Sequence, residues 1–322
     1  MNSQILTGVI AVLGILANLA GVGEASARQS GHDQHGAHGA HGTAGHGHHH
    51  ADFQSDRLHV RVDGDGPRDI ILIPGLSSSP EVWDSTVEHL GAGWRVHRIH
   101  VHGFAGAPAG GNATGPVAAP VAEEIARYIA EAGLDKPVVV GHSMGGTIGM
   151  MLAARHPDSV GKLMVVDMVP FMGAMFGAPG ATAESVAPVA DQIYAAQANS
   201  PHDAYVAQAT QAINGMINTE SLRAGPLEDM RTSDQKVSAA AFRELIVTDL
   251  RPELTAITAP VEVVYVKFND ARMTPELTDT IYRMSFANLP GATLKRIDDA
   301  AHFIMFDQPQ AFFAELDAFI AR

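Results

Sequence analysis

The chain of 322 residues contains no cysteine. This absence excludes disulfide bridges, thiolate metal sites, a cysteine nucleophile and lipid attachment to cysteine. Basic residues are also scarce, because 21 Lys and Arg stand against 35 Asp and Glu and leave a formal net charge of −14. An acidic chain without clusters of Lys and Arg argues against nucleic acid as a partner. The hydrophobic content of 46%, in contrast, is enough for one large core or two small ones.

The N-terminus begins with an apolar run over Ile5–Ala20, and Ala25-Ser26-Ala27 follows it as an A-x-A cleavage pattern. This arrangement predicts a secretory signal peptide over residues 1–27 and a periplasmic or secreted protein. The first four residues carry no Lys or Arg, however, and Ile5–Gly23 has about the length that spans a bilayer. An uncleaved membrane anchor is therefore the alternative.

Residues 28–53 are dominated by glycine, alanine and histidine. Such a segment cannot bury enough apolar area to fold, so we expect a disordered linker. Imidazoles at this density bind Zn, Cu or Ni weakly, and the candidate ligands are His46, His48, His49 and His50. A solvated linker without a metal role is the alternative.

Residues 54–322 form the predicted globular domain, in which short β-branched runs alternate with helical segments. This alternation predicts the α/β class, with a mostly parallel central sheet and helices on both faces. The expected strands are Leu58–Val62 at an edge, Asp69–Ile73, Trp94–Val101, Pro137–Val140, Lys162–Asp167, Pro260–Val266 and Ala292–Ile297. The expected helices are Glu81–Leu90, Pro120–Ala132, Gln308–Ala321 and one around Glu276–Ala287.

The alternation stops between about residues 168 and 258, where the sequence is rich in alanine and methionine and carries no clear strand. A helical insertion at this point predicts a cap over the carboxyl edge of the sheet, where such folds bind ligands. Its methionines either line an adaptable apolar pocket or pack the core of the cap itself. They are Met168, Met172, Met175, Met216 and Met230.

A glycine-rich turn follows the strand at Val138–Val140 and leads into an apolar helix. It reads Gly141-His142-Ser143-Met144-Gly145-Gly146 and contains the pattern Gly-x-Ser-x-Gly. This pattern between a buried strand and a helix is typical of a nucleophile elbow, which raises a serine hydroxyl above the sheet edge. Ser143 is therefore the candidate nucleophile, with a structural turn serine as the alternative. On so tight a turn, we expect His142 to point away from the site.

Four segments together resemble the α/β-hydrolase family with a helical lid. They are Pro74-Gly75-Leu76-Ser77, the turn around Ser143, Phe268-Asn269-Asp270 and Ala301-His302-Phe303. Their order along the chain, serine then acid then histidine, is the order of that family. The resemblance extends over about Leu58–Arg322.

The resemblance implies a Ser-His-acid triad in which His302 is the base and Asp270 orients it. Asp167, at the end of the preceding strand, is the alternative acid. The backbone N–H groups of Leu76 and Met144 would form the oxyanion hole.

The predicted activity is hydrolysis of a carboxylic ester through an acyl-enzyme, without a cofactor and on a small, apolar acyl substrate. C–C, amide and thioester hydrolysis are alternatives on the same fold. An envelope protein that binds metal through the His-rich residues is the alternative from another class.

Overall fold

The computed structural model describes residues 53–267 and 273–322. The predicted signal peptide, nearly all of the His-rich linker and Asp270 lie outside these residues.

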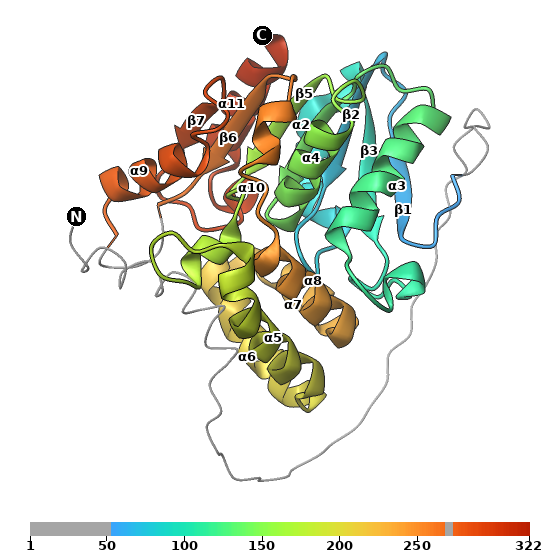
Figure 1. Ribbon diagram of the computed structural model, residues 1–322. Helices are drawn as coiled ribbons and strands as arrows, with labels where there is room; N and C mark the ends of the chain where they lie inside the picture. The colour runs from blue at the N-terminus through green and yellow to red at the C-terminus, as the bar shows by residue number, and fades with distance from the viewer. Residues whose placement is uncertain (1–52, 268–272) are drawn as a thin grey trace.

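The described residues build one sheet of seven strands in the order β1-β3-β2-β4-β5-β6-β7 (Figure 1). β1 lies at one edge and pairs antiparallel with β3, whereas all other neighbours are parallel. The predicted α/β class with a mostly parallel sheet is therefore confirmed. The strands are β1 (Leu58–Asp63), β2 (Arg68–Ile73), β3 (Trp94–Val101), β4 (Val138–His142), β5 (Lys162–Val166), β6 (Val261–Tyr265) and β7 (Thr293–Arg296).

Helices cover both faces of the sheet, which explains why β2 is apolar at every buried position. Alternate side chains of a strand point to opposite faces. Ile71 belongs to the same buried cluster as Ile125 of α3, whereas Ile70 packs in a second cluster with Trp83 and with Phe312 of α11. The helices of the sheet domain are α2 (Asp84–Leu90), α3 (Ala118–Glu131), α4 (Met144–Arg155), α9 (Pro275–Ser285), α10 (Ile304–Asp307) and α11 (Pro309–Ala321).

The segment between β5 and β6 contains helices and no strand over residues 168–258, all of which the structure describes. We call this segment the helical insertion. Two of its helices begin with a side-chain cap, Thr182 before α5 and Asp234 before α8. In Figure 1 the helices of the insertion lie together beyond one end of the strands, the end at which β5 leads into the insertion. Its helices are α5 (Ala183–Asn199), α6 (His202–Met216), α7 (Ala224–Thr232) and α8 (Gln235–Val247).

A buried carboxylate ties the insertion to the sheet domain. Glu244 of α8 accepts hydrogen bonds from three successive backbone N–H groups at the start of α3, those of Val117, Ala118 and Ala119, at 2.5, 2.7 and 2.9 Å. The first N–H groups of a helix have no partner within the helix and form a partly positive site. A carboxylate from α8 satisfies them here, in place of a local cap.

We expect Glu244→Ala to lower the free energy of unfolding by about 3 kcal/mol, because three N–H groups would lose a charged acceptor. For a domain of this size, the melting temperature should fall by about 5–10 °C. Glu244→Gln should cost less, since its amide oxygen still accepts. The control is Glu88→Ala at an exposed position of α2. Equal melting temperatures for Glu244→Ala and Glu88→Ala would contradict this role.

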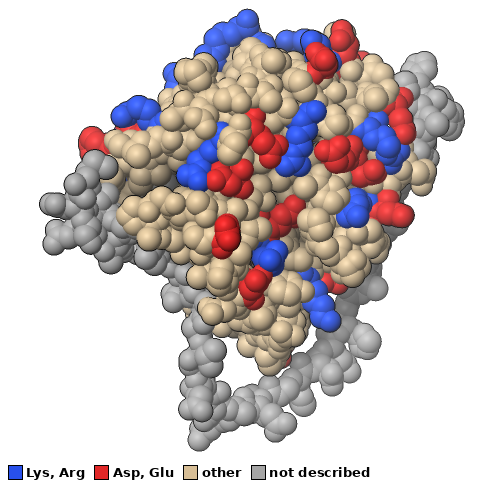
Figure 2. Space-filling model, viewed as in Figure 1, with Lys and Arg blue, Asp and Glu red and all other residues tan. Residues whose placement is uncertain are grey.

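Acidic and basic side chains are interspersed on the surface that Figure 2 shows. Oppositely charged side chains also form pairs in the described residues, such as Arg155–Glu253 at 2.8 Å and Arg243–Asp191 at 2.6 Å. This face therefore offers no continuous basic surface to a polyanion. Among the described residues, no helix combines the length and apolar character that crossing a bilayer requires.

Candidate active site

Ser143 occupies the sharp turn between β4 and α4. Its φ of 54° and ψ of −120° are unusual for a residue with a side chain. The turn depends on glycine on both sides. A Cβ on Gly141 would lie 2.1 Å from the carbonyl oxygen of Gly145, and one on Gly145 would lie 2.1 Å from that of Ile73. The Gly-x-Ser-x-Gly pattern therefore has a steric cause, and it holds Ser143 above the end of the sheet.

His302 and Asp167 meet at the same edge, although 135 residues separate them. The ring Nδ1 of His302 donates to Oδ2 of Asp167 over 2.6 Å. Asp167 directly follows β5 and has a left-handed φ of 50°. The structure thus brings together three sequence candidates, Ser143, His302 and Asp167, around one cavity.

The other carboxylate oxygen of Asp167 is also bound. Oδ1 accepts from the Tyr282 hydroxyl at 2.9 Å and from the Val266 backbone N–H at 3.2 Å. Burial, together with the Asp167 charge, raises the pKa of Tyr282 well above its usual value, so this phenol stays a hydrogen-bond donor. Tyr282 is a functional candidate that the sequence analysis missed. Its position in an amphipathic helix distant from any motif carries no signal for this contact.

His142 does not point away from the site, so that expectation was wrong. Its ring lines the cavity, lies 4.6 Å from the His302 ring and is almost fully buried. Nε2 donates to the His302 carbonyl oxygen at 3.0 Å, and Nδ1 has no partner among the described residues. Burial holds the pKa of His142 well below its ordinary value, so the ring is neutral. His142 therefore fixes the backbone that carries His302.

The loop after β2 packs directly against the serine turn. A Cβ on Gly75 would lie 3.2 Å from both the Ser143 Cβ and the His142 Nδ1, so only glycine allows this approach without a shift. In the described part of the chain, neither the Leu76 nor the Met144 backbone N–H donates to a protein atom. Leu76 lies in the loop after β2, and Met144 is the first residue of α4, directly after Ser143.

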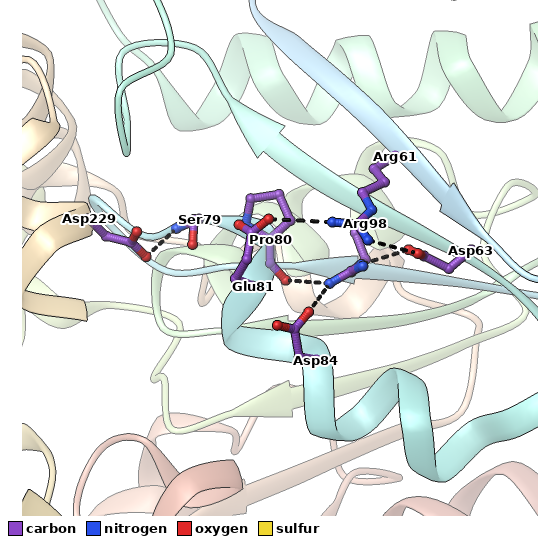
Figure 3. A network of polar contacts seen from close by, with 8 residues as sticks. All are labelled: Arg61, Asp63, Ser79, Pro80, Glu81, Asp84, Arg98 and Asp229. Atoms are coloured by element: carbon purple, nitrogen blue, oxygen red, sulfur yellow. Dashed lines mark hydrogen bonds and ion pairs between the residues drawn. The ribbon is translucent and has the colours of Figure 1, made fainter. Parts of the chain in front are cut away.

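The same loop is anchored from two directions, as Figure 3 shows. Asp229 of α7 accepts from the Ser79 backbone N–H at 2.8 Å. The buried guanidinium of Arg98 in β3 donates to the Pro80 carbonyl at 3.3 Å and is neutralised by Asp63 and Asp84. These contacts from both the insertion and the sheet hold the loop in place beside Ser143.

A cavity of about 210 Å³ lies between the sheet edge and the helical insertion. Its lining is mostly apolar, and the insertion supplies most of the residues. All five methionines singled out in the sequence line it, namely Met168, Met172, Met175, Met216 and Met230. Met168, Met172 and Met230 are also buried members of hydrophobic clusters, so these side chains both line the cavity and pack the core. Unbranched, polarizable side chains adapt to ligands of different shape.

The remaining sequence candidates are not among the described residues. Asp270 is outside the described residues, as are the histidines at 46 and 48–50. Over residues 53–267 and 273–322, no group of three or more His, Asp and Glu side chains is arranged to hold a metal ion.

A family model described as alpha/beta hydrolase fold matches residues 70–309. A pimeloyl-[acyl-carrier protein] methyl ester esterase from Edwardsiella ictaluri (strain 93-146) is 26% identical over 262 residues, which cover 80% of this chain and 94% of that protein. Its counterpart from Vibrio atlanticus (strain LGP32) is 32% identical over 120 residues, 37% of this chain and 43% of that protein.

Among solved structures, the enol-lactonase from Burkholderia xenovorans LB400 superposes with a TM-score of 0.65 at 21% identity. The match covers 82% of this chain and 96% of that one. At this identity the likeness concerns the fold.

Proposed function

Because this chain belongs to the α/β-hydrolase fold family, we propose that it is a serine hydrolase that cleaves carboxylic esters through an acyl-enzyme. The observation that carries the proposal is the hydrogen bond of 2.6 Å between His302 Nδ1 and Asp167 Oδ2, on a cavity that Ser143 also lines. The methyl ester esterase that matches 80% of the chain supports an ester as the bond cleaved.

In the proposed reaction, the Ser143 hydroxyl attacks the ester carbonyl while Nε2 of His302 accepts its proton. Asp167 accepts from Nδ1–H, which keeps Nε2 unprotonated before attack and stabilises the imidazolium that forms. This assignment replaces Asp270, the acid favoured by the sequence, with Asp167, its alternative. The His302 imidazolium then returns the proton to the leaving alcohol.

The tetrahedral oxyanion is proposed to lie between the backbone N–H groups of Leu76 and Met144, which have no protein acceptor within the described residues. One such donor typically contributes about 3 kcal/mol to stabilisation of the transition state. Water, deprotonated by His302, then attacks the acyl-enzyme and releases the carboxylic acid and free Ser143.

The first test is a series of p-nitrophenyl esters from acetyl to decanoyl, with the full chain, followed by a p-nitrophenyl phosphonate. We expect activity to be highest for short or medium acyl chains, because the cavity of about 210 Å³ is small for a ligand pocket. The phosphonate should abolish activity and add one phosphonyl group at Ser143, located by peptide mass spectrometry. Labelling elsewhere would contradict the assigned nucleophile. Failure to cleave any ester would favour amide, thioester or C–C bond cleavage.

The N-terminal residues carry separate proposals that rest on the sequence alone. Residues 1–27 are proposed as a signal peptide, which would direct the enzyme to the periplasm or the medium. Weak binding of divalent metal by His46, His48, His49 and His50 stays a prediction. Mass determination of the exported protein would distinguish cleavage after Ala27 from a retained anchor.

A further inference from the structure

Three hydroxyl groups gather on the wall of an otherwise apolar cavity. Ser77 Oγ lies 2.8 Å from Ser238 Oγ, within hydrogen-bond distance, and the Tyr205 side chain lies beside both serines. The three residues come from separate elements, the loop after β2, α8 and α6. All three line the cavity, and all are buried, with 7% or less of each residue exposed. We call them the hydroxyl cluster.

The hydroxyl cluster can present either a proton or a lone pair to a ligand. Each hydroxyl is one donor and also an acceptor, and its hydrogen rotates to suit its partners. Opening the Ser77–Ser238 hydrogen bond frees a donor for an oxygen in the cavity. Burial raises the pKa of Tyr205, so its hydroxyl keeps its proton. Three neutral hydroxyls provide no positive charge to offset a carboxylate.

The cluster also lies next to the proposed reaction centre. Ser77 follows Leu76, one of the two proposed oxyanion donors, and neighbouring Cα atoms are about 3.8 Å apart. Ser77 has a left-handed φ of 54°, which is an unfavourable conformation for a residue with a Cβ. In this conformation the Ser77 side chain contacts Ser238 of the insertion directly.

We propose that the hydroxyl cluster binds an uncharged oxygen of the substrate close to the scissile ester, so that the preferred substrates are hydroxy or oxo esters. The inference rests on the proposed function. A purely apolar acyl chain would bury these hydroxyls without offering a partner, whereas a substrate hydroxyl or ketone can bond to Tyr205 or replace the Ser77–Ser238 hydrogen bond. This refines the apolar acyl substrate expected from the sequence.

The test compares esters in which a hydroxyl replaces a methyl group of similar size. On the acyl side, p-nitrophenyl 3-hydroxybutyrate is compared with p-nitrophenyl 3-methylbutyrate. On the alcohol side, 2-hydroxyethyl butyrate is compared with propyl butyrate. With the full chain, we expect kcat/KM to be higher for the hydroxy ester in at least one pair. Tyr205→Phe and Ser238→Ala should each reduce that preference about fivefold to tenfold, as expected for one neutral hydrogen bond.

Ser200→Ala, at the end of α5 and outside the cavity lining, is the matched control and should keep the wild-type preference. Equal kcat/KM within both pairs for the wild-type chain would overturn the inference even if a variant failed to fold. A preference that persists in both folded variants would overturn it as well. If the wild-type chain cleaves none of the four esters, the proposed function itself fails and the inference fails with it.

Discussion

Ser143→Ala is expected to lower kcat for p-nitrophenyl ester hydrolysis by about a millionfold, to a rate near the limit of detection. The alanine keeps the Cβ that the turn already accommodates at φ 54°, so the variant should fold with nearly the wild-type melting temperature. Only the attacking oxygen is lost. Because His302 acts by activating this oxygen, its contribution is lost as well, and only the oxyanion donors and substrate binding still favour the reaction.

The matched control is Ser159→Ala, a serine beyond the C-terminus of α4 that is absent from the cavity lining. It should retain wild-type kcat and KM. A folded Ser143→Ala protein that kept about one per cent of the activity or more would show that another group, or water activated directly by His302, performs the attack. Neither outcome depends on knowing the natural substrate.

The sheet was predictable because each strand has a local sequence pattern that identifies it. Runs such as Val138–Val140 are β-branched and too short for a helix, and each has a structured counterpart in β1 to β7. The serine turn was predictable for the same reason, since the clashes that require Gly141 and Gly145 involve atoms only a few residues apart or on the adjacent strand.

The acid could not be chosen from sequence. Asp167 follows β5, and Asp270 follows β6 a few residues later. These two strands are parallel neighbours in the sheet, so sequence position alone places an acid after either strand at the same edge, although Asp270 itself is outside the described residues. The choice depends on the direction of the His302 ring, which tertiary packing sets and no local pattern encodes.

The contacts between the insertion and the sheet domain could not be predicted from the sequence either. Glu244 caps α3 from 127 residues away, and the Ser77–Ser238 contact joins positions 161 residues apart. A glutamate inside an amphipathic helix predicts a solvated side chain, and a serine in a loop predicts a turn. Both acquire their roles only when the insertion folds onto the sheet.

Asp167→Asn is expected to lower kcat/KM by about ten-thousandfold. The asparagine oxygen can still accept from the Tyr282 hydroxyl and the Val266 N–H, which directs the amide NH₂ toward Nδ1 of His302. A donor at that place binds the ring with Nδ1 unprotonated and its proton on Nε2. In that tautomer His302 cannot accept the proton of Ser143. Asparagine tolerates the left-handed φ of 50°, so the loss should be chemical and the fold should remain.

Asp270→Asn is the paired measurement, and we expect its kcat/KM to stay within about threefold of wild type, as for a change that leaves the triad intact. Asp and Asn side chains are nearly the same size. Each variant therefore changes only the charge and the hydrogen-bond donors at its own position, and the two effects can be compared on one substrate. A loss confined to Asp270→Asn would restore the acid that the sequence favoured, and the Asp167 contact would then be structural. A large loss in Asp167→Asn alone, with an unchanged melting temperature, assigns the orientation of His302 to the carboxylate that follows β5.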